Sequence, residues 1–315
     1  MRRTAFAVVV ALMGTLAPTG DVVAAPVPGT TCDVFPADNV WNMDVSGLPV
    51  HPKTKRWKKS AHASSTLLHP DFGGDPYGFP FEVTDASTPT TSVSFTYDDE
   101  SDPGPYPFTA GTPIEQGSDR HALMIDADAC VLYELFNARW NGGDPTAGSG
   151  AIFDLGSNAL RPKTWTSADA AGRPIFPGLV RYDEVQAGSI DHAIRFTVSC
   201  TRNRFIWPAR HQAGVNDKDC PPMGARFRLK NSFKFAGFSA DARVVLKALQ
   251  RYGMIVADNG SNWYFQGTMD DGWTDDLLDE LKSIPASAFQ AVDESACKVD
   301  PDSAQFQYGP GCPAP

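Results

Sequence analysis

Six cysteines constrain this chain more than any other feature of its 315 residues. An even number of cysteines in an exported chain favours disulfides, and no C-x-x-C pair supports a zinc site. Closeness in the sequence predicts the links Cys200–Cys220 and Cys297–Cys312, and elimination leaves Cys32 to pair with Cys130. The chain is therefore expected to fold in an oxidising compartment.

The first 25 residues predict a secretory signal peptide. Met1-Arg2-Arg3 precedes an apolar run over Ala5–Leu16, and small residues follow at Val23–Ala25. This is the order of charged, apolar and small residues that such signals have. The apolar run is shorter than the roughly 20 residues that span a bilayer. We expect a secreted, extracellular protein with no membrane span.

The composition excludes some classes of partner. The formal net charge is −10, with 20% charged and 42% hydrophobic residues. Nonspecific binding to nucleic acid or to anionic membranes needs clustered positive charge, so both are disfavoured. The proportions are those of an ordinary globular chain.

Alternating apolar residues predict a mainly β fold. Ser92–Tyr97 and Ile190–Val198 read as strands with one buried face, and His121–Asp126 with Cys130–Asn137 reads as a hairpin. Two helices are predicted near the C-terminus, over Ser239–Tyr252 and Thr274–Ile284. The expected architecture is an antiparallel β-sandwich or a jelly-roll-like single domain, with both helices at its periphery.

The expected domain occupies residues 26–293. Its first part, residues 26–90, is rich in Pro, Gly, Thr and Ser and is predicted to wrap irregularly around the domain. Beyond Asp293 the chain is polar and holds two cysteines. Residues 294–315 are therefore predicted to be a disulfide-stapled tail.

Titratable residues gather in Pro177–His211, which makes this stretch a candidate for a polar site. In the strand Ile190–Val198, His192 falls on the apolar face and Arg195 on the other. Arg210 and His211 follow the next strand, where loops on a rigid sheet tend to carry binding groups. We rank them above His192, which fits a core histidine.

Two acids outside that stretch lie among apolar neighbours. Glu134 is in the middle of a predicted strand, and Asp154 stands between Phe153 and Leu155. An unpaired carboxylate on an apolar face is costly, so such a group has a partner or lines a cleft. A structural ion pair or an exposed strand edge would explain Glu134 equally well.

Other motifs are weak or missing. Asp99, Glu100 and Asp102 form an acidic loop that offers a weak calcium site, although it lacks the D-x-D-x-D-G spacing and fits a solvated turn better. No phosphate-binding loop, dinucleotide fingerprint, G-x-S-x-G elbow or H-E-x-x-H is present. No other cofactor is expected.

Several phrases resemble a family of secreted bacterial proteins of unestablished activity. They are LHPDFG, DESDPGPYPF, DRHALMIDADACVLYELFNARW, PGLVRYDEVQAGSIDHAIRFT, PPMGARFRLK and YGMIVADNGSNWYF. The resemblance covers roughly residues 35–293. It implies an association with polysaccharides and brings no catalytic residues with it.

Three functions are compatible with these patterns, all with a glycan as partner and a monomeric protein. The first is a glycoside hydrolase with Glu134 and Asp154 as its carboxylate pair. The second is a polysaccharide lyase with His121 or His211 as base and a cation to neutralise a uronate, chosen from Arg120, Arg195 and Arg210. The third is a noncatalytic glycan- or surface-binding protein whose aromatic platforms include Trp140 and Trp207.

Overall fold

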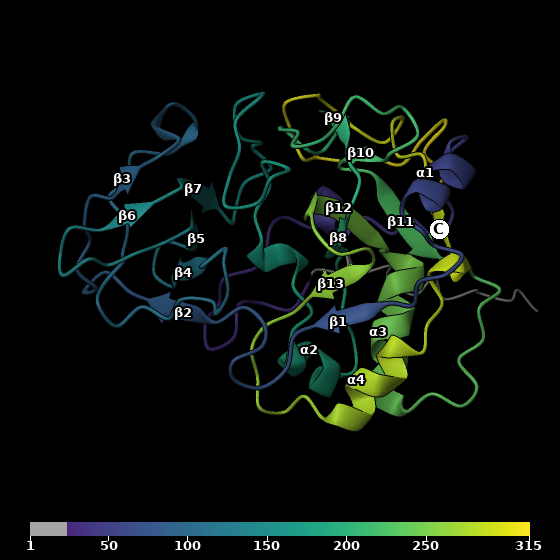
Figure 1. Ribbon diagram of the computed structural model, residues 1–315, viewed down its shortest axis with the longest axis horizontal. Coiled ribbons are helices and arrows are strands. Elements are labelled where there is room, and N and C mark those ends of the chain that lie inside the picture. The colour runs from purple at the N-terminus through teal and green to yellow at the C-terminus, as the bar shows by residue number, and fades with distance from the viewer. Residues whose placement is uncertain (1–23) are drawn as a thin grey trace, which may run out of the picture.

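The computed structural model describes residues 24–315, which fold mostly into sheets with four α-helices (Figure 1). The predicted signal peptide lies almost entirely outside the described residues. The strands are β1 (His69–Asp71), β2 (Phe81–Thr84), β3 (Ser94–Phe95), β4 (Ala122–Asp126), β5 (Val131–Phe136), β6 (Thr146–Ala147), β7 (Ser149–Asp154), β8 (Ile194–Val198), β9 (Arg202–Phe205), β10 (Pro222–Met223), β11 (Arg226–Leu229), β12 (Met254–Asn259), β13 (Tyr264–Gln266) and β14 (Phe289–Ala291). The helices are α1 (Thr54–Ser60), α2 (Tyr182–Ala187), α3 (Ala240–Arg251) and α4 (Asp275–Lys282).

The larger sheet has six strands in the order β1-β13-β8-β12-β11-β14. One of its faces is apolar, because Phe196 of β8 pairs with Phe265 of β13, and both pack with Trp263 and Phe227 in the main core. Side chains alternate along a strand, so the neighbouring positions point to the other face. That second face carries polar residues and is the base of the site described below.

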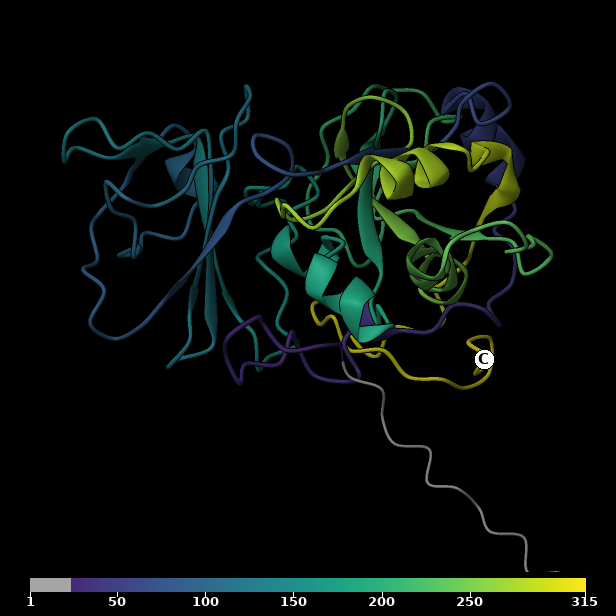
Figure 2. The same ribbon diagram turned by 90° about the horizontal axis from the view of Figure 1, so that it is seen from below.

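The smaller sheet has four strands in the order β2-β4-β5-β7, beside the two-stranded sheet of β3 and β6 (Figure 2). The predicted hairpin is confirmed as β4 and β5. Its turn is closed by Asp126, whose Oδ1 accepts hydrogen bonds from the N–H groups of Asp128 and Ala129, both at 2.9 Å. Leu123 and Leu132 of this sheet join the main core, while Met124 and Leu135 join a separate cluster.

Both predicted C-terminal helices are present as α3 and α4, and each begins at a side-chain cap. Ser239 Oγ accepts a hydrogen bond from the N–H of Ala242 at 3.2 Å, and Thr274 Oγ1 accepts one from Leu277 at 3.3 Å. Such caps satisfy N–H groups that the first helical turn leaves free. Asp275 and Asp276 add negative charge at the positive end of α4.

The sheets are mixed, which differs from the expected antiparallel arrangement. β8 pairs in parallel with β12, and β1 pairs in parallel with β13. The Asn259-Gly260 turn predicts a hairpin of β12 with β13, but β8 lies between these two strands and pairs with both. The Asn259-Gly260 turn therefore does not join neighbouring strands, because β8, which comes earlier in the chain, lies between β12 and β13.

All three predicted disulfides are confirmed: Cys32–Cys130, Cys200–Cys220 and Cys297–Cys312. The tail beyond Asp293 contributes to a second small core in which Cys297, Ala304 and Cys312 pack with residues of the N-terminal segment, such as Val40 and Met43. It is thus more than a stapled extension.

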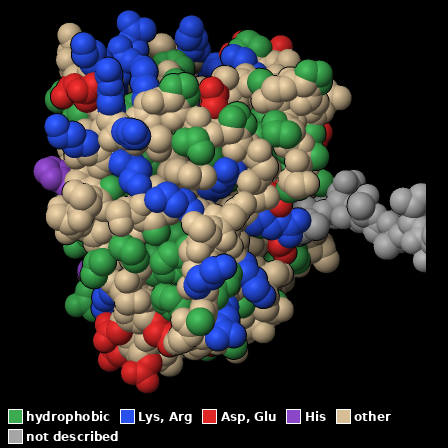
Figure 3. All heavy atoms as spheres, turned by 90° about the vertical axis from the view of Figure 1, so that its right-hand side faces the viewer, with side chains coloured by type: hydrophobic (Ala, Val, Ile, Leu, Met, Phe, Trp, Pro, Cys, Tyr) green, Lys and Arg blue, Asp and Glu red, His purple; other side chains and the backbone are tan. Residues whose placement is uncertain are grey.

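Charge is unevenly distributed over the surface. The face in Figure 3 carries many Lys and Arg side chains, with its acids concentrated near the lower edge, although the chain as a whole has a net charge of −10. In residues 24–315 no helix is long and apolar enough to cross a membrane.

Candidate active site

Two adjoining cavities lie where the polar face of the six-stranded sheet meets segments that flank the smaller sheet. One has a volume of about 230 Å³ and the other of about 450 Å³. Both are lined by Asp119, Asp258 and Asn259, so they adjoin. We call the pair the inter-sheet cavity.

Strand register brings three polar residues into one row at the base of this cavity. Asp71 of β1 is the direct neighbour of Gln266 in β13. The β8–β13 register pairs Tyr264 with Thr197 and Phe265 with Phe196, which continues the row from Gln266 to Arg195. These three residues line the smaller cavity, as does Thr197, which lies two positions after Arg195 in β8.

A β-bulge turns Asp258 toward the same cavity. Val256 pairs with Phe196, but the next partner, Thr197, is opposite Asp258 rather than Ala257. Without the extra residue, strict alternation would place Asp258 on the apolar face with Val198. The bulge thus re-aims a carboxylate, a use of bulges that is common near active sites.

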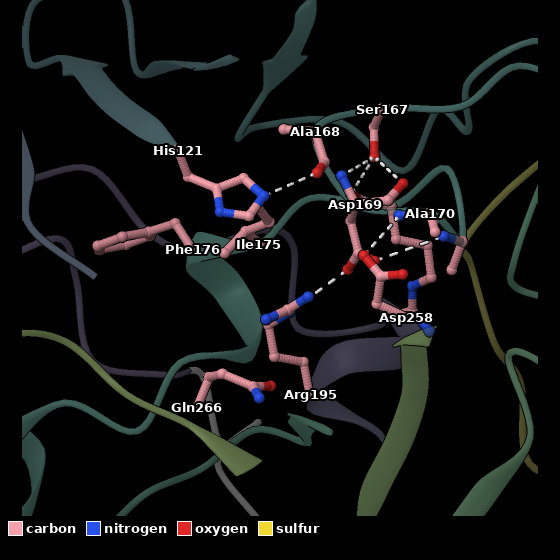
Figure 4. A network of polar contacts seen from close by, with 12 residues as sticks. His121, Ser167, Ala168, Asp169, Ala170, Ile175, Phe176, Arg195, Asp258 and Gln266 are labelled. Carbon is pink, nitrogen blue, oxygen red and sulfur yellow. Dashed lines mark hydrogen bonds and ion pairs between the residues drawn. The ribbon is translucent and has the colours of Figure 1, made fainter. Parts of the chain in front are cut away.

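Arg195 is fixed from two sides. Its Nε donates to Asp169 Oδ2 at 3.4 Å (Figure 4). Its guanidinium lies 5.4 Å from the centroid of the Phe79 ring. Both Arg195 and Asp169 are buried. Burial would lower the pKa of Arg195, but the charges of Asp169 and Asp258 outweigh this effect and raise it.

Both ring nitrogens of His121 are engaged. Its Nδ1 lies 2.5 Å from Glu115 Oε2, and its Nε2 lies 3.1 Å from the carbonyl oxygen of Ala168. Burial would lower the pKa of His121, but the hydrogen bond and charge of Glu115 outweigh it and raise the pKa. A histidine with both ring nitrogens engaged is a poor general base and a good positioning group.

Asp258 has the most perturbed carboxyl group among those that line the cavity. Burial and then the charge of Asp169 raise its pKa to about 6, against the opposing effect of Arg195. Its Oδ2 accepts a hydrogen bond from the Ala170 N–H at 3.4 Å (Figure 4). Such a carboxyl group keeps its proton to a higher pH than an ordinary aspartate and can act as an acid in mildly acidic solution.

Asp71 is a second acid in the same cavity, and it is more exposed. The pKa of Asp71 is raised overall, because desolvation outweighs the opposing effects of His69, Gln266 and Arg195. The two carboxyl groups still differ in their surroundings: Asp258 is the more buried and lies near the like charge of Asp169, whereas Asp71 is exposed and lies near His69. Different surroundings of this kind separate an acid from a base.

The predicted pair of Glu134 and Asp154 does not come together. In the β5–β7 register Glu134 is opposite Ala151, and Asp154 is opposite Val131, three residues along β5. Side chains three positions apart on a strand point to opposite faces, so the two carboxylates cannot converge.

Each of these two acids has a local role. Glu134 is fully buried and accepts hydrogen bonds from the N–H groups of Ile175 at 2.8 Å and Phe176 at 2.9 Å. Burial raises the pKa of Glu134 to about 7, against the effect of these two donors. Asp154 is exposed, and its Oδ1 accepts from the Gly156 N–H at 2.8 Å within a turn.

Of the predicted basic residues, Arg195, His121 and His211 line the inter-sheet cavity. His211 Nδ1 lies 2.9 Å from the Ala170 carbonyl oxygen, and its Nε2 lies 3.9 Å from Glu100 Oε2. Arg210 is elsewhere: it is buried and bonds Asp302 at 2.7 Å. Arg120 donates to the Ala138 carbonyl oxygen at 3.1 Å.

The predicted aromatic platforms have structural partners. Trp140 packs edge-on against Phe108 at 5.6 Å, and Trp207 Nε1 donates to the Ser303 carbonyl oxygen at 2.8 Å. The aromatic residues that line the cavity are different ones, including Tyr264 and Tyr97, of which Tyr97 is 51% exposed.

The acidic loop does not assemble as a calcium site. Asp102 Oδ2 pairs with Arg161 and accepts the Ile152 N–H at 2.9 Å, while Glu100 Oε2 accepts the Thr166 N–H at 2.9 Å. Within residues 24–315, Cys200, Asp217 and Cys220 are the one set of three whose ligand atoms lie close enough for a metal. Both of those sulfurs belong to a disulfide.

Sequence reasoning missed Asp71, Glu115, Asp169, Asp258 and Gln266. Asp258 ends the strand pattern of Met254–Asp258, and strand ends are favoured places for site residues, so a signal for this acid was available. Asp71 falls within residues 26–90, which the sequence predicts to be irregular, and its place at the end of β1 was not predicted. No local pattern marks the other three, because only tertiary contacts bring them to the cavity.

Comparison with known proteins gives no further guidance: no family model, no curated protein and no solved structure matches this chain.

Proposed function

We propose that this protein is a secreted glycoside hydrolase whose carboxyl pair is Asp258 and Asp71. The observation that carries this proposal is that two acids in unlike surroundings share one accessible cavity, where Asp258 has a pKa of about 6. Hydrolysis of a glycosidic bond needs such a pair, one group protonated and one ionised.

Asp258 would be the general acid. Its proton would pass to the glycosidic oxygen as the bond to the anomeric carbon breaks, so that the leaving sugar departs as an alcohol. Asp71 would take a proton from the attacking water, as in an inverting enzyme. Two strands, β13 and β8, lie between β1 and β12, which disfavours the separation of ~5–5.5 Å that direct attack needs.

The surrounding residues would position the substrate. Arg195 makes one hydrogen bond to protein through Nε, so its other N–H groups can meet sugar hydroxyl groups. Tyr97 and Tyr264 offer aromatic faces on the two parts of the cavity. Clefts with aromatic walls and a few polar groups are typical of sites for small ligands and sugars.

The charge of the cavity favours hydrolysis over uronate elimination. A lyase needs a cation to neutralise the substrate carboxylate, but Arg195 is already paired with Asp169. The cavity also has a surplus of acids, which would repel a uronate. In addition, both ring nitrogens of His121 are occupied, so it is not poised to remove a proton.

A panel of purified polysaccharides, read for new reducing ends, tests the proposal. On a responsive glycan, Asp258→Asn should lower kcat by about 100-fold or more, as expected for loss of a general acid. Asp71→Asn should reduce kcat at least as much. Asp154→Asn is the matched control, because Asp154 is also an acid at a strand end but lies outside the inter-sheet cavity.

Two outcomes would overturn the proposal. One is activity that survives both Asp258→Asn and Asp71→Asn in folded protein. The other is formation of unsaturated sugar products, detected by ultraviolet absorbance, which would show elimination in place of hydrolysis.

A further inference from the structure

We propose that the inter-sheet cavity accepts a sugar unit that carries a protonated amino group, as in a deacetylated amino-sugar polymer. This inference rests on the proposed function, since it names the class of glycan that the same site would cleave. It follows from the balance of charge, from an unpaired acceptor and from the way the acids are spaced.

The charges of the residues that line the smaller cavity do not cancel, because acids outnumber cations. Two ion pairs are already internally neutral: Arg195 with Asp169, and His121 with Glu115. Asp71, Asp119 and Asp258 remain, and no Lys, Arg or His in residues 24–315 forms an ion pair with any of them. Even with Asp258 protonated as the acid, the cavity keeps a negative surplus that a cationic ligand would neutralise.

The side-chain oxygen of Gln266 is a hydrogen-bond acceptor that lacks a donor within residues 24–315. Gln266 lines the cavity and is 4% exposed, and its Oε1 accepts no hydrogen bond from any group in residues 24–315. Its Nε2 is engaged, at 3.4 Å from the Tyr264 carbonyl oxygen. A buried acceptor without a donor is costly, so a ligand donor is expected here. Figure 4 shows Gln266 beside Arg195 at the base of this polar network.

The positions of the cavity acids favour an ammonium group over a metal ion as the ligand. Metal ligands must surround one point, yet within residues 24–315 the ligand atoms of the cavity acids form no compact set of three. A sugar ammonium group has a different requirement, because its three N–H bonds reach separate acceptors. The dispersed acids and the Gln266 oxygen suit such a group.

The test compares three tetrasaccharides that differ at one substituent: the glucosamine, N-acetylglucosamine and glucose oligomers. Affinity is measured by calorimetry and cleavage by release of reducing ends. We expect the glucosamine oligomer to bind at least about tenfold more tightly than the other two, the range for a hydrogen bond to a charged group. Its binding should weaken with added salt.

Two pairs of variants locate the binding. Gln266→Leu should remove most of the preference for glucosamine, whereas Gln186→Leu, on the exposed side of α2, should not. Because Gln266 is buried and its replacement can disturb folding, Asp119→Asn is the second variant. Asp119 is exposed, and its change should weaken the glucosamine oligomer alone, unlike the change of the exposed Asp144 to Asn.

Each outcome decides between the two proposals. Equal binding of glucosamine and glucose oligomers, with cleavage that needs Asp258, would overturn the amine inference and leave the hydrolase. Tight glucosamine binding that depends on Gln266 or Asp119, without any cleavage, would support the inference and overturn the hydrolase. Glucosamine binding that neither Gln266→Leu nor Asp119→Asn changes would reflect overall charge and overturn the inference.

Discussion

At the scale of single residues, a buried acid can serve either structure or chemistry, and its neighbours decide which. Glu134 and Asp258 both have raised pKa values because burial disfavours their charged forms. Glu134 is bound by backbone N–H groups in the core, whereas Asp258 lines a cavity. The sequence marks Glu134 as unusual but does not reveal that its partners are the N–H groups of Ile175 and Phe176.

Glu134 should make the stability of the protein depend on pH. The pKa of Glu134 is raised from 4.5 to about 7, so the folded state binds a proton that the unfolded state has released in this range. Its contribution is complete below pH 4.5 and is lost as the pH rises through about 7. With about 1.4 kcal/mol for each tenfold change in proton affinity, the loss is on the order of 3 kcal/mol.

Glu134→Gln tests this directly, because glutamine keeps one acceptor oxygen and cannot ionise. Urea unfolding at pH 4.5 and at pH 7.5 should show the variant gaining stability relative to the original protein at the higher pH. A difference in unfolding free energy that is the same at both pH values would contradict the expected role of ionisation.

At the scale of elements, the local pattern predicts helices and strands well and their pairing poorly. Ser239, the apolar stripe and the closing glycine define α3 in the sequence, and the helix is found there. In Ala225–Lys230, apolar residues alternate with cations, which predicts a strand with a solvated basic face. β11 lies there, but Arg226 and Arg228 are buried. Arg226 donates to the carbonyl oxygens of Val40 and Met43, which are remote in the sequence.

The bulge in β12 is another feature that the local sequence pattern does not predict. A strict alternation in Met254–Asn259 would place Asp258 on the apolar face, and one extra residue reverses that placement. The sequence therefore predicts a strand over Met254–Asp258, but not that Asp258 and Asp71 line one cavity. That placement depends on the strand order, in which β13 and β8 lie between β1 and β12.

Ser239 should stabilise α3 and also join it to α4. Its Oγ accepts from the Ala242 N–H and lies 2.6 Å from Glu280 Oε2, to which it donates. Ser239→Ala should therefore cost about 1 kcal/mol or somewhat more of unfolding free energy, the usual value for a lost cap. The exposed Ser295 provides the control, because Ser295→Ala removes no cap. Equal stability of the two variants in urea unfolding would refute the capping role.

At the scale of the whole molecule, the disulfides connect segments that packing alone would have to bring together. Cys32 and Cys130 are 98 residues apart, and their link ties the N-terminal segment to the hairpin of the smaller sheet. Cys297–Cys312 closes a span of 15 residues. These pairings could be predicted because sequence closeness and elimination left one simple choice.

Loss of the long link should destabilise the protein more than loss of the short one. In the chain-entropy account, a loop of ~100 residues is worth about 4.7 kcal/mol and one of ~15 residues about 3 kcal/mol. Cys32→Ser/Cys130→Ser should thus lower the unfolding free energy by more than Cys297→Ser/Cys312→Ser. The reverse order in urea unfolding would show that native packing, and not loop closure, sets the effect.

The whole fold also explains why the candidate site is acidic in a chain with a strongly basic face. Many Lys and Arg side chains lie on the face in Figure 3, whereas Asp71, Asp119 and Asp258 line the inter-sheet cavity. Among the described residues that line the cavity, Arg195 is paired with Asp169 and His121 with Glu115, and His211 lies 3.9 Å from Glu100.

The most direct test of the account is the titration of Asp258 itself, which needs no substrate. Carbon-13 NMR of labelled aspartate carboxyl groups, with Asp258→Asn to assign the signal, gives its pKa in the intact protein. We expect a value of about 6, which keeps Asp258 available as an acid in the cavity that Asp71 also lines. A value near 3.8, the ordinary one for aspartate, would mean that Asp258 is ionised throughout the working range and would contradict its assignment as the general acid.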